Sequence, residues 1–83
     1  MDSQKTRILI VDDHEVVREG LKRILADSDL RVTIGEASAG QDALTMARSG
    51  DWDVVVLDIS LPDRSGLDVL KQIKSYYPKL PVL

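Results

Sequence analysis

The chain contains no cysteine, and this absence sets the first limit on its function. Without thiols it can form neither a disulfide-stapled secreted fold nor a zinc module built on cysteine ligands. Aromatic residues make up only 4% of the chain, and no stretch approaches the ~20 continuous apolar residues of a membrane-spanning helix. Residues 1–7 are polar, and no signal-like apolar core follows them. We therefore expect a cytoplasmic protein without a membrane segment.

Positive charge is also scarce, since 11 lysines and arginines stand against 14 acidic residues for a net charge of -3. A surface that binds nucleic acid without sequence preference needs clustered basic residues, so the composition argues against that activity. The 83 residues suffice for one small domain and exclude a large multidomain enzyme. We expect residues 1–83 to belong to a single domain.

Apolar periodicity divides the chain into alternating strands and helices. The runs at 8–11 and 54–57 are continuous and β-branched, as in strands buried on both faces of a parallel sheet. A looser alternation at 31–37 is typical of an edge strand, and 81–83 begins a further strand. Helical spacing predicts amphipathic helices at about 14–26 and at about 66–77. Between them, a further helix is predicted to end near Gly50. The order β-α-β-α-β-α-(β) predicts an α/β fold with right-handed crossovers.

Each expected helix is preceded by a polar residue that can cap it. The three pairs of capping type are Asp12 with Glu15, Ser38 with Gln41, and Ser65 with Asp68. In a capping box the first side chain accepts a hydrogen bond from a backbone amide that has no partner within the helix. The sequence therefore predicts that Asp12, Ser38 and Ser65 start the three helices.

Acidic side chains stand at the carboxyl ends of both buried strands. Asp12 and Asp13 follow the first of these strands, and Asp58 follows the second. Ligands of open α/β sheets bind outside these strand ends, so neighbouring strands would bring the three carboxylates into one crevice. Like charges this close repel unless a cation offsets them, and Mg²⁺ suits oxygen ligands. We expect a Mg²⁺ site whose carboxylate can act as a nucleophile towards phosphorus.

Simpler interpretations of single residues stay open beside this one. Asp12 or Asp13 alone can serve as a helix cap, although their occurrence together with Asp58 favours a site. His14 is the only histidine, and we expect a solvated residue at a helix start rather than a phosphorelay or metal-binding group. We expect Ser38 and Ser65 to be helix caps rather than nucleophiles, because the single histidine does not complete a Ser-His-Asp triad with either of them. The glycines form neither G-x-G-x-x-G nor a P-loop.

The motifs around these carboxylates resemble the receiver domain of two-component response regulators. The resemblance rests on Ile8-Leu-Ile-Val-Asp-Asp13, on Val54-Val-Val-Leu-Asp58-Ile-Ser-Leu-Pro62 and on Gly66, and it runs from about residue 7 to residue 83. His14 followed by Val17-Arg-Glu-Gly-Leu21 is similar, more narrowly, to the NarL/LuxR type. The resemblance implies a flavodoxin-like (CheY-like) fold in a signalling domain rather than an enzyme.

The same resemblance implies a role for each site residue. Asp58 would accept a phosphoryl group from a phosphohistidine on a sensor histidine kinase. The implied Mg²⁺ ligands are Asp13 and Asp58 directly, Asp12 mainly through a metal-bound water, and the backbone carbonyl of Ser60. Pro62 and Gly66 would shape the loop that aims this carbonyl, because proline fixes φ and glycine permits a close approach.

The chain departs from a complete receiver at its carboxyl end. A complete receiver has strand order 2-1-3-4-5, and this chain stops inside what corresponds to the fourth strand. We therefore expect a truncated receiver without the last strand and helices, and without the Ser/Thr and Lys that contact phosphoryl oxygens. Mg²⁺ binding should remain, whereas phosphotransfer by this chain alone should be impaired. DNA would be reached only through a missing C-terminal helix-turn-helix domain, the output domain that regulates transcription.

Truncation would also uncover the third strand and the first helix, which predicts self-association as a homo-oligomer or swapped dimer.

Two other functions stay open. A haloacid-dehalogenase-like aspartyl-phosphate hydrolase also has a nucleophilic Asp at a strand end, but it needs a second Asp where this chain has Ser60. A self-associating structural fragment would keep the acidic crevice without using it.

Overall fold

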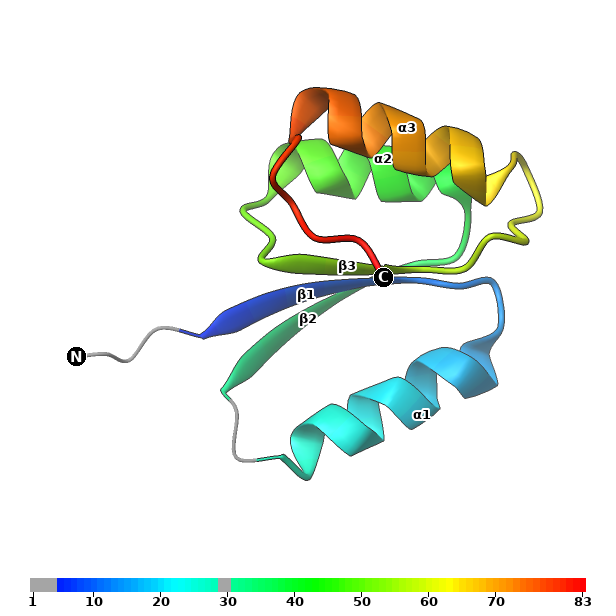
Figure 1. Ribbon diagram of the computed structural model, residues 1–83. Coiled ribbons are helices and arrows are strands. Elements are labelled where there is room, and N and C mark those ends of the chain that lie inside the picture. The colour runs from blue at the N-terminus through cyan, green and yellow to red at the C-terminus, as the bar shows by residue number, and fades with distance from the viewer. Residues whose placement is uncertain (1–4, 29–30) are drawn as a thin grey trace.

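A computed structural model describes residues 5–28 and 31–83, which form a parallel sheet with helices on both faces (Figure 1). The strands are β1 (Thr6–Val11), β2 (Val32–Ala37) and β3 (Val54–Leu57), and the helices are α1 (Glu15–Ala26), α2 (Gly40–Ser49) and α3 (Gly66–Tyr76). The sheet order is β2-β1-β3. Helices α2 and α3 lie together on one face, and α1 lies alone on the other (Figure 1). The predicted alternation and parallel sheet are confirmed.

β1 is the central strand and pairs in parallel with both neighbours. It begins earlier than the sequence predicted, because the Thr6 amide donates to the Arg31 carbonyl at 2.8 Å and extends the pairing with β2. At the other end Val11 lies opposite Leu57 of β3. The two strands therefore end level, and the residues that follow them emerge at the same edge of the sheet.

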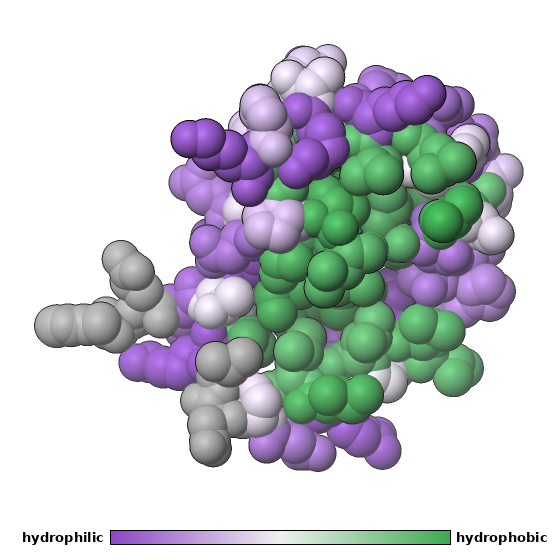
Figure 2. All heavy atoms as spheres, viewed as in Figure 1, coloured by the Kyte–Doolittle hydropathy of each residue, from purple (hydrophilic) through white to green (hydrophobic). Residues whose placement is uncertain are grey.

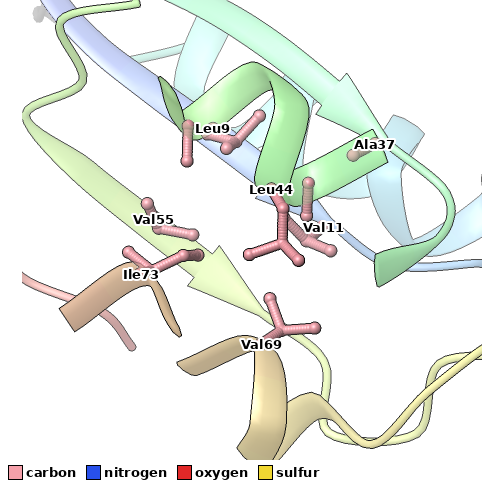
Figure 3. Packing of buried hydrophobic residues seen from close by; sticks show 9 residues of the cluster. Leu9, Val11, Ala37, Leu44, Val55, Val69 and Ile73 are labelled. Carbon is pink, nitrogen blue, oxygen red and sulfur yellow. The ribbon is translucent and has the colours of Figure 1, made fainter. Parts of the chain in front are cut away.

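The hydrophobic core fills the space between the sheet and the α2/α3 layer (Figure 3). Its labelled members in Figure 3 are Leu9, Val11, Ala37, Leu44, Val55, Val69 and Ile73. Leu9 of β1, Val55 of β3 and Ile73 of α3 are each 0% exposed. Burying a side chain of this size contributes roughly 1.5–3 kcal/mol. These contacts fix β1 and β3 relative to each other and so define the edge where the acidic residues lie.

The opposite face of the sheet is covered less completely. None of the described residues of α1 is buried, and Ile24 of this helix is 66% exposed. All of 8–11 in β1 is buried, as predicted, but in β3 only Val55 is. The prediction that β3 is buried on both faces is therefore wrong, because α1 alone covers this side in the described part of the chain.

The outer edge of β3 pairs with the last residues of the chain, as the sequence predicted for a further strand. Val82 forms a parallel bridge with Val55. The Val55 amide donates to the Pro81 carbonyl at 2.9 Å, and the Leu83 amide donates to the Val55 carbonyl at 2.8 Å. Residues 81–83 thus cover the centre of this edge.

Only one of the three predicted helix caps is confirmed. The Ser65 hydroxyl accepts a hydrogen bond from the Leu67 amide at 3.1 Å at the start of α3. The cap position of α1 is His14 rather than Asp12, and it carries no side-chain cap. The Asp12 carboxylate instead accepts from the His14 amide at 2.9 Å, ahead of the helix. The prediction for Asp12 is wrong because its carboxylate binds the amide of His14, which precedes the first residue of α1, instead of an amide within the helix.

The predicted cap of α2 is also wrong. Its cap position is Ala39 rather than Ser38, again without a side-chain cap. The first amides of α2 are bound instead by Asp63, which accepts from Gly40 at 2.7 Å and from Gln41 at 3.0 Å. Asp63 comes from the loop between β3 and α3, so a carboxylate distant in sequence takes the place of the local hydroxyl.

In the part of the chain described, no helix is long and apolar enough to span a membrane.

Candidate metal centre

The level ends of β1 and β3 bring four residues with potential ligand atoms into one group. Asp12, Asp13, His14 and Asp58 each offer an atom, and these atoms all lie within 4.8 Å of one another. Asp12 and Asp58 are half-buried, whereas Asp13 and His14 are exposed. The three carboxylates that the sequence placed at these strand ends therefore do meet, in a crevice open to solvent.

Backbone hydrogen bonds fix the positions of two of these carboxylates. The Asp12 amide donates to the Ala37 carbonyl at 3.0 Å, which continues the pairing of β1 with β2. The Asp58 amide donates to the Val11 carbonyl at 2.8 Å, which continues the pairing of β3 with β1. Both residues thus continue the backbone hydrogen bonding of the sheet by one residue. The distance between their side chains therefore follows from the spacing of adjacent strands.

The loop after β3 orients the Asp58 carboxylate. The Ser60 amide donates to Asp58 Oδ1 at 3.1 Å. The Gly66 amide donates to the Ile59 carbonyl at 2.8 Å and closes the loop at the start of α3. A Cβ atom on Gly66 would overlap the Ile59 backbone and lie 2.7 Å from the Asp58 carbonyl oxygen. This close approach supports a loop-shaping role for Gly66, whereas the roles of Pro62 and of the Ser60 carbonyl remain predictions.

His14 contacts the acidic pair rather than solvent alone. Its Nδ1 atom lies 2.9 Å from Asp12 Oδ1 and 3.0 Å from Asp13 Oδ1, while 64% of its side chain stays exposed. The hydrogen bond with Asp12 and then the charge of Asp13 raise the pKa of His14. The expectation of a solvated residue at a helix start is right about exposure and position but missed these contacts. The signal in the sequence was a lone histidine placed directly after two aspartates.

The chemistry of the donor set fits a hard divalent cation. Three carboxylates provide oxygen ligands, and their partial exposure leaves positions for water and a phosphate group. Within residues 5–28 and 31–83, no lysine or arginine forms an ion pair with any of the three. Among the described side chains, the carboxylates therefore have no lysine or arginine counter-charge, and a cation such as Mg²⁺ would neutralise them.

Comparison with known proteins places this geometry in a family. Residues 8–83 match the family described as the response regulator receiver domain. The transcriptional regulatory protein YdfI of Bacillus subtilis (strain 168) is 46% identical over 68 residues, which are 82% of this chain and 32% of that protein. The chain spans about a third of the length of such curated relatives, with values from 22% to 36%.

Solved structures share the fold. A LuxR-family two-component response regulator from Aurantimonas sp. SI85-9A1 has a TM-score of 0.82 and 30% identity, over 95% of this chain and 56% of that chain. The response regulator TrrA from Thermotoga maritima, in complex with Mg²⁺-BeF, has a TM-score of 0.85 and 38% identity, over 93% and 65%. In its complex with the histidine kinase ThkA the values are 0.80 and 36%, over 93% and 65%.

Proposed function

Because this chain belongs to the response regulator receiver domain family of two-component signalling, we propose that Asp58 accepts a phosphoryl group from a sensor histidine kinase. The observation that carries the proposal is the convergence of Asp12, Asp13 and Asp58 within 4.8 Å at one edge of the sheet. The complexes of TrrA with Mg²⁺-BeF and with a histidine kinase support the same chemistry here. Receiver domains are signalling domains, so we assign this chain no enzymatic turnover of its own.

We further propose that the crevice holds Mg²⁺. Its ligands would be the carboxylates of Asp12, Asp13 and Asp58 and the backbone carbonyl of Ser60. When bound, Mg²⁺ supplies positive charge that neutralises the phosphoryl oxygens. Asp12 and Asp13 would hold this charge beside Asp58, so that an anionic phosphoryl group could approach an anionic acceptor.

Asp58 is oriented for attack on phosphorus. Oδ1 accepts from the Ser60 amide, and no other hydrogen bond reaches this carboxylate in the described part of the chain. The second oxygen is therefore available to form the bond to phosphorus. As this bond forms, the phosphorus–nitrogen bond of the kinase phosphohistidine breaks, and the nitrogen keeps the electron pair. The products are an acyl phosphate on Asp58 and a dephosphorylated histidine.

The partners and setting follow the same proposal. Phosphorylation would control a DNA-binding transcriptional output domain of the NarL/LuxR type in the cytoplasm. The LuxR-family structure and the name of YdfI support this kind of output. Residues 1–83 would contribute the receiver part, and a homo-oligomer or swapped dimer of this chain would arise from its uncovered face.

Incubation with acetyl phosphate and Mg²⁺, followed by intact-mass spectrometry, tests the acceptor. We expect a gain of one phosphoryl group that depends on Mg²⁺ and is absent from Asp58→Asn, and this gain should be slow because phosphotransfer by this chain alone is expected to be impaired. Asp51→Asn is the matched control, since Asp51 is exposed and lies outside the acidic crevice.

The other functions give different results in the same experiment. Continuous release of inorganic phosphate without a stable adduct would indicate an aspartyl-phosphate hydrolase. No reaction with acetyl phosphate or with a cognate kinase would indicate a structural fragment and would contradict the proposal.

A further inference from the structure

Arg18 of α1 reaches the backbone at the end of β1, directly beside the acidic crevice. Its Nη1 atom donates to the Asp12 carbonyl at 2.6 Å. The Asp12 amide donates to the Ala37 carbonyl of β2 at 3.0 Å. The backbone of Asp12 is therefore held from two sides, by the sheet through its amide and by a helix through its carbonyl.

The guanidinium of Arg18 is itself held in one orientation. Nε donates to Glu36 Oε1 of β2 at 3.0 Å, and the side chain is only 16% exposed. Because a guanidinium is planar, contacts through two of its nitrogens fix the whole group, which a flexible ammonium does not achieve. The Arg18 amide donates to the His14 carbonyl at 3.2 Å and fixes the base of the side chain in the first turn of α1. Arg18 thus connects α1, β2 and the end of β1.

The carbonyl that Arg18 binds belongs to the peptide between Asp12 and Asp13. A peptide group moves as one planar unit, so the orientation of this carbonyl determines where the backbone of Asp13 begins. Asp13 lies outside both β1 and α1, in the connection between them. A rotation of this peptide would therefore displace the acidic pair relative to Asp58, with which it shares the crevice.

Lys22 lies one turn further along α1 and offers a comparison within the same helix. Its Nζ atom lies 2.9 Å from Glu36 Oε2 and 2.7 Å from Glu19 Oε2. Lys22 thus tethers α1 to the same acidic side chain of β2 as Arg18 does. In the described part of the chain it donates no hydrogen bond to the backbone of Asp12. The two residues therefore separate attachment of the helix from contact with the acidic pair.

We propose that Arg18 is a positioning residue of the acidic crevice, whose guanidinium fixes the peptide between Asp12 and Asp13 and so orients their carboxylates relative to Asp58. The inference rests on the proposed function, since it concerns how the same site is assembled. Within the described residues Arg18 forms no ion pair with these carboxylates, so it acts through the backbone. Its positive charge by itself would repel a cation in the crevice.

Calorimetric titration of the 83-residue chain with Mg²⁺ tests the inference through the sign of the change. By electrostatics alone, removing a positive charge near a cation site strengthens cation binding. We expect the opposite for Arg18→Met, with Mg²⁺ affinity lower by about tenfold, at the low end of what loss of a supporting residue costs a metal site. Lys22→Met is the matched control, because it removes one charge and one Glu36 contact from the same helix. It should bind Mg²⁺ at least as tightly as the native chain.

Arg18→Lys is a second variant that keeps the positive charge and can keep the ion pair with Glu36. One ammonium group does not reproduce the planar set of donors that also binds the Asp12 carbonyl, so Mg²⁺ affinity should fall here too. Carbon-13 NMR of the Asp12 carbonyl in the absence of Mg²⁺ reports the hydrogen bond itself. Its resonance should shift in both Arg18 variants and stay in place in Lys22→Met.

The positioning role and the proposed function fail in different ways. Native Mg²⁺ affinity in Arg18→Met or Arg18→Lys, or an equal loss in Lys22→Met, would overturn the role of Arg18 and leave Asp58 as the proposed acceptor. A native chain whose Mg²⁺ affinity depends on Arg18, but which gains no phosphoryl group from acetyl phosphate, would support the positioning role and contradict the proposed function. A native chain that binds no Mg²⁺ would contradict both.

Discussion

At the scale of single residues, Asp63 joins the loop that follows Asp58 to the start of α2. Its two oxygens accept hydrogen bonds from the Gly40 amide at 2.7 Å and the Gln41 amide at 3.0 Å. Arg64 adds a hydrogen bond from Nη2 to Gln41 Oε1 at 3.0 Å. The loop that orients the proposed phosphoryl acceptor is thus held from two sides, by Gly66 at its end and by α2 in its middle.

Asp63 should make the stability of the protein depend on pH. The hydrogen bonds from Gly40 and then Gln41 hold the pKa of Asp63 below its ordinary value, because they favour the charged carboxylate. A group whose pKa is lower in the folded state stabilises the fold above its unfolded pKa and loses that contribution as the pH falls. We expect urea denaturation to show reduced stability below about pH 4, with a smaller pH dependence in Asp63→Asn. An identical pH dependence in both proteins would contradict this role.

Two glycines should respond in opposite directions to alanine. A Cβ on Gly66 would overlap the Ile59 backbone, so we expect Gly66→Ala to destabilise the fold by about 1–3 kcal/mol and to weaken Mg²⁺ binding. A Cβ on Gly20 would meet nothing within 4 Å inside helix α1. Gly20→Ala should therefore stabilise the protein by roughly 0.5–1 kcal/mol. Urea denaturation of both variants checks this pair, and equal effects would show that the contacts of Gly66 do not matter.

At the scale of elements, the strands could be predicted because the information is local. A continuous β-branched run favours a strand whatever its final burial, and 54–57 forms β3 with the predicted bounds. The caps of α1 and α2 could not be predicted in this way. The partner of the Gly40 amide lies 23 residues further along the chain, so no local pattern points to Asp63.

The same reasoning explains how much of the site was predictable. Adjacent parallel strands end at one edge, and this rule alone brings Asp12 and Asp13 next to Asp58. The contacts of His14 depend on a side-chain orientation that strand order does not determine. The role of the loop from 59 to 66 was predicted only from its resemblance to the receiver motif. Its shape could not be predicted from local patterns, because it depends on the close approach of Gly66 to the backbone of Asp58 and Ile59.

Helix α1 makes several polar contacts with β2 and with the end of β1. Arg18 Nε donates to Glu36 Oε1 at 3.0 Å, and Arg18 Nη1 donates to the Asp12 carbonyl at 2.6 Å. Lys22 Nζ lies 2.9 Å from Glu36 Oε2. Lys22 and then Arg18 hold the pKa of Glu36 below its ordinary value. These residues therefore connect α1 to β2 instead of forming a purely solvated helix face.

Because α1 lacks buried residues, it should open before the other helices. Both α2 and α3 contribute buried residues to the core, whereas the described residues of α1 contribute none. Hydrogen exchange followed by mass spectrometry should show faster exchange of amides in α1 than in α2 or α3. Glu36→Gln should accelerate exchange in α1 and leave α3 unchanged. Equal protection of all three helices would contradict this hierarchy.

At the scale of the whole molecule, apolar side chains form a continuous band across one face (Figure 2). Among residues 5–28 and 31–83, the large hydrophobic residues that remain exposed are Val16, Val17, Ile24, Ile59, Leu67, Tyr76, Tyr77 and Leu83. In Figure 1 the same view shows β3 and the carboxyl end of the chain between α1 and the α2/α3 layer. An uncovered apolar face of this kind favours association.

We therefore expect the isolated chain to self-associate, as its sequence predicts. Multi-angle light scattering at tens of micromolar should show a mass above that of the monomer, because burial of apolar surface stabilises a dimer. Ile24→Lys, at a position 66% exposed in α1, should shift the equilibrium towards the monomer if α1 takes part in the contact. A monodisperse monomer in the native chain would contradict the expectation.

The central claim is that Asp58, supported by Asp12 and Asp13, is the phosphoryl acceptor. Borohydride reduction of the phosphorylated chain, followed by peptide mass spectrometry, tests it most directly, since an acyl phosphate on aspartate is reduced to homoserine. The account predicts homoserine at position 58 and nowhere else, in a reaction that requires Mg²⁺. Homoserine at another aspartate, or none after incubation with acetyl phosphate and Mg²⁺, would contradict it.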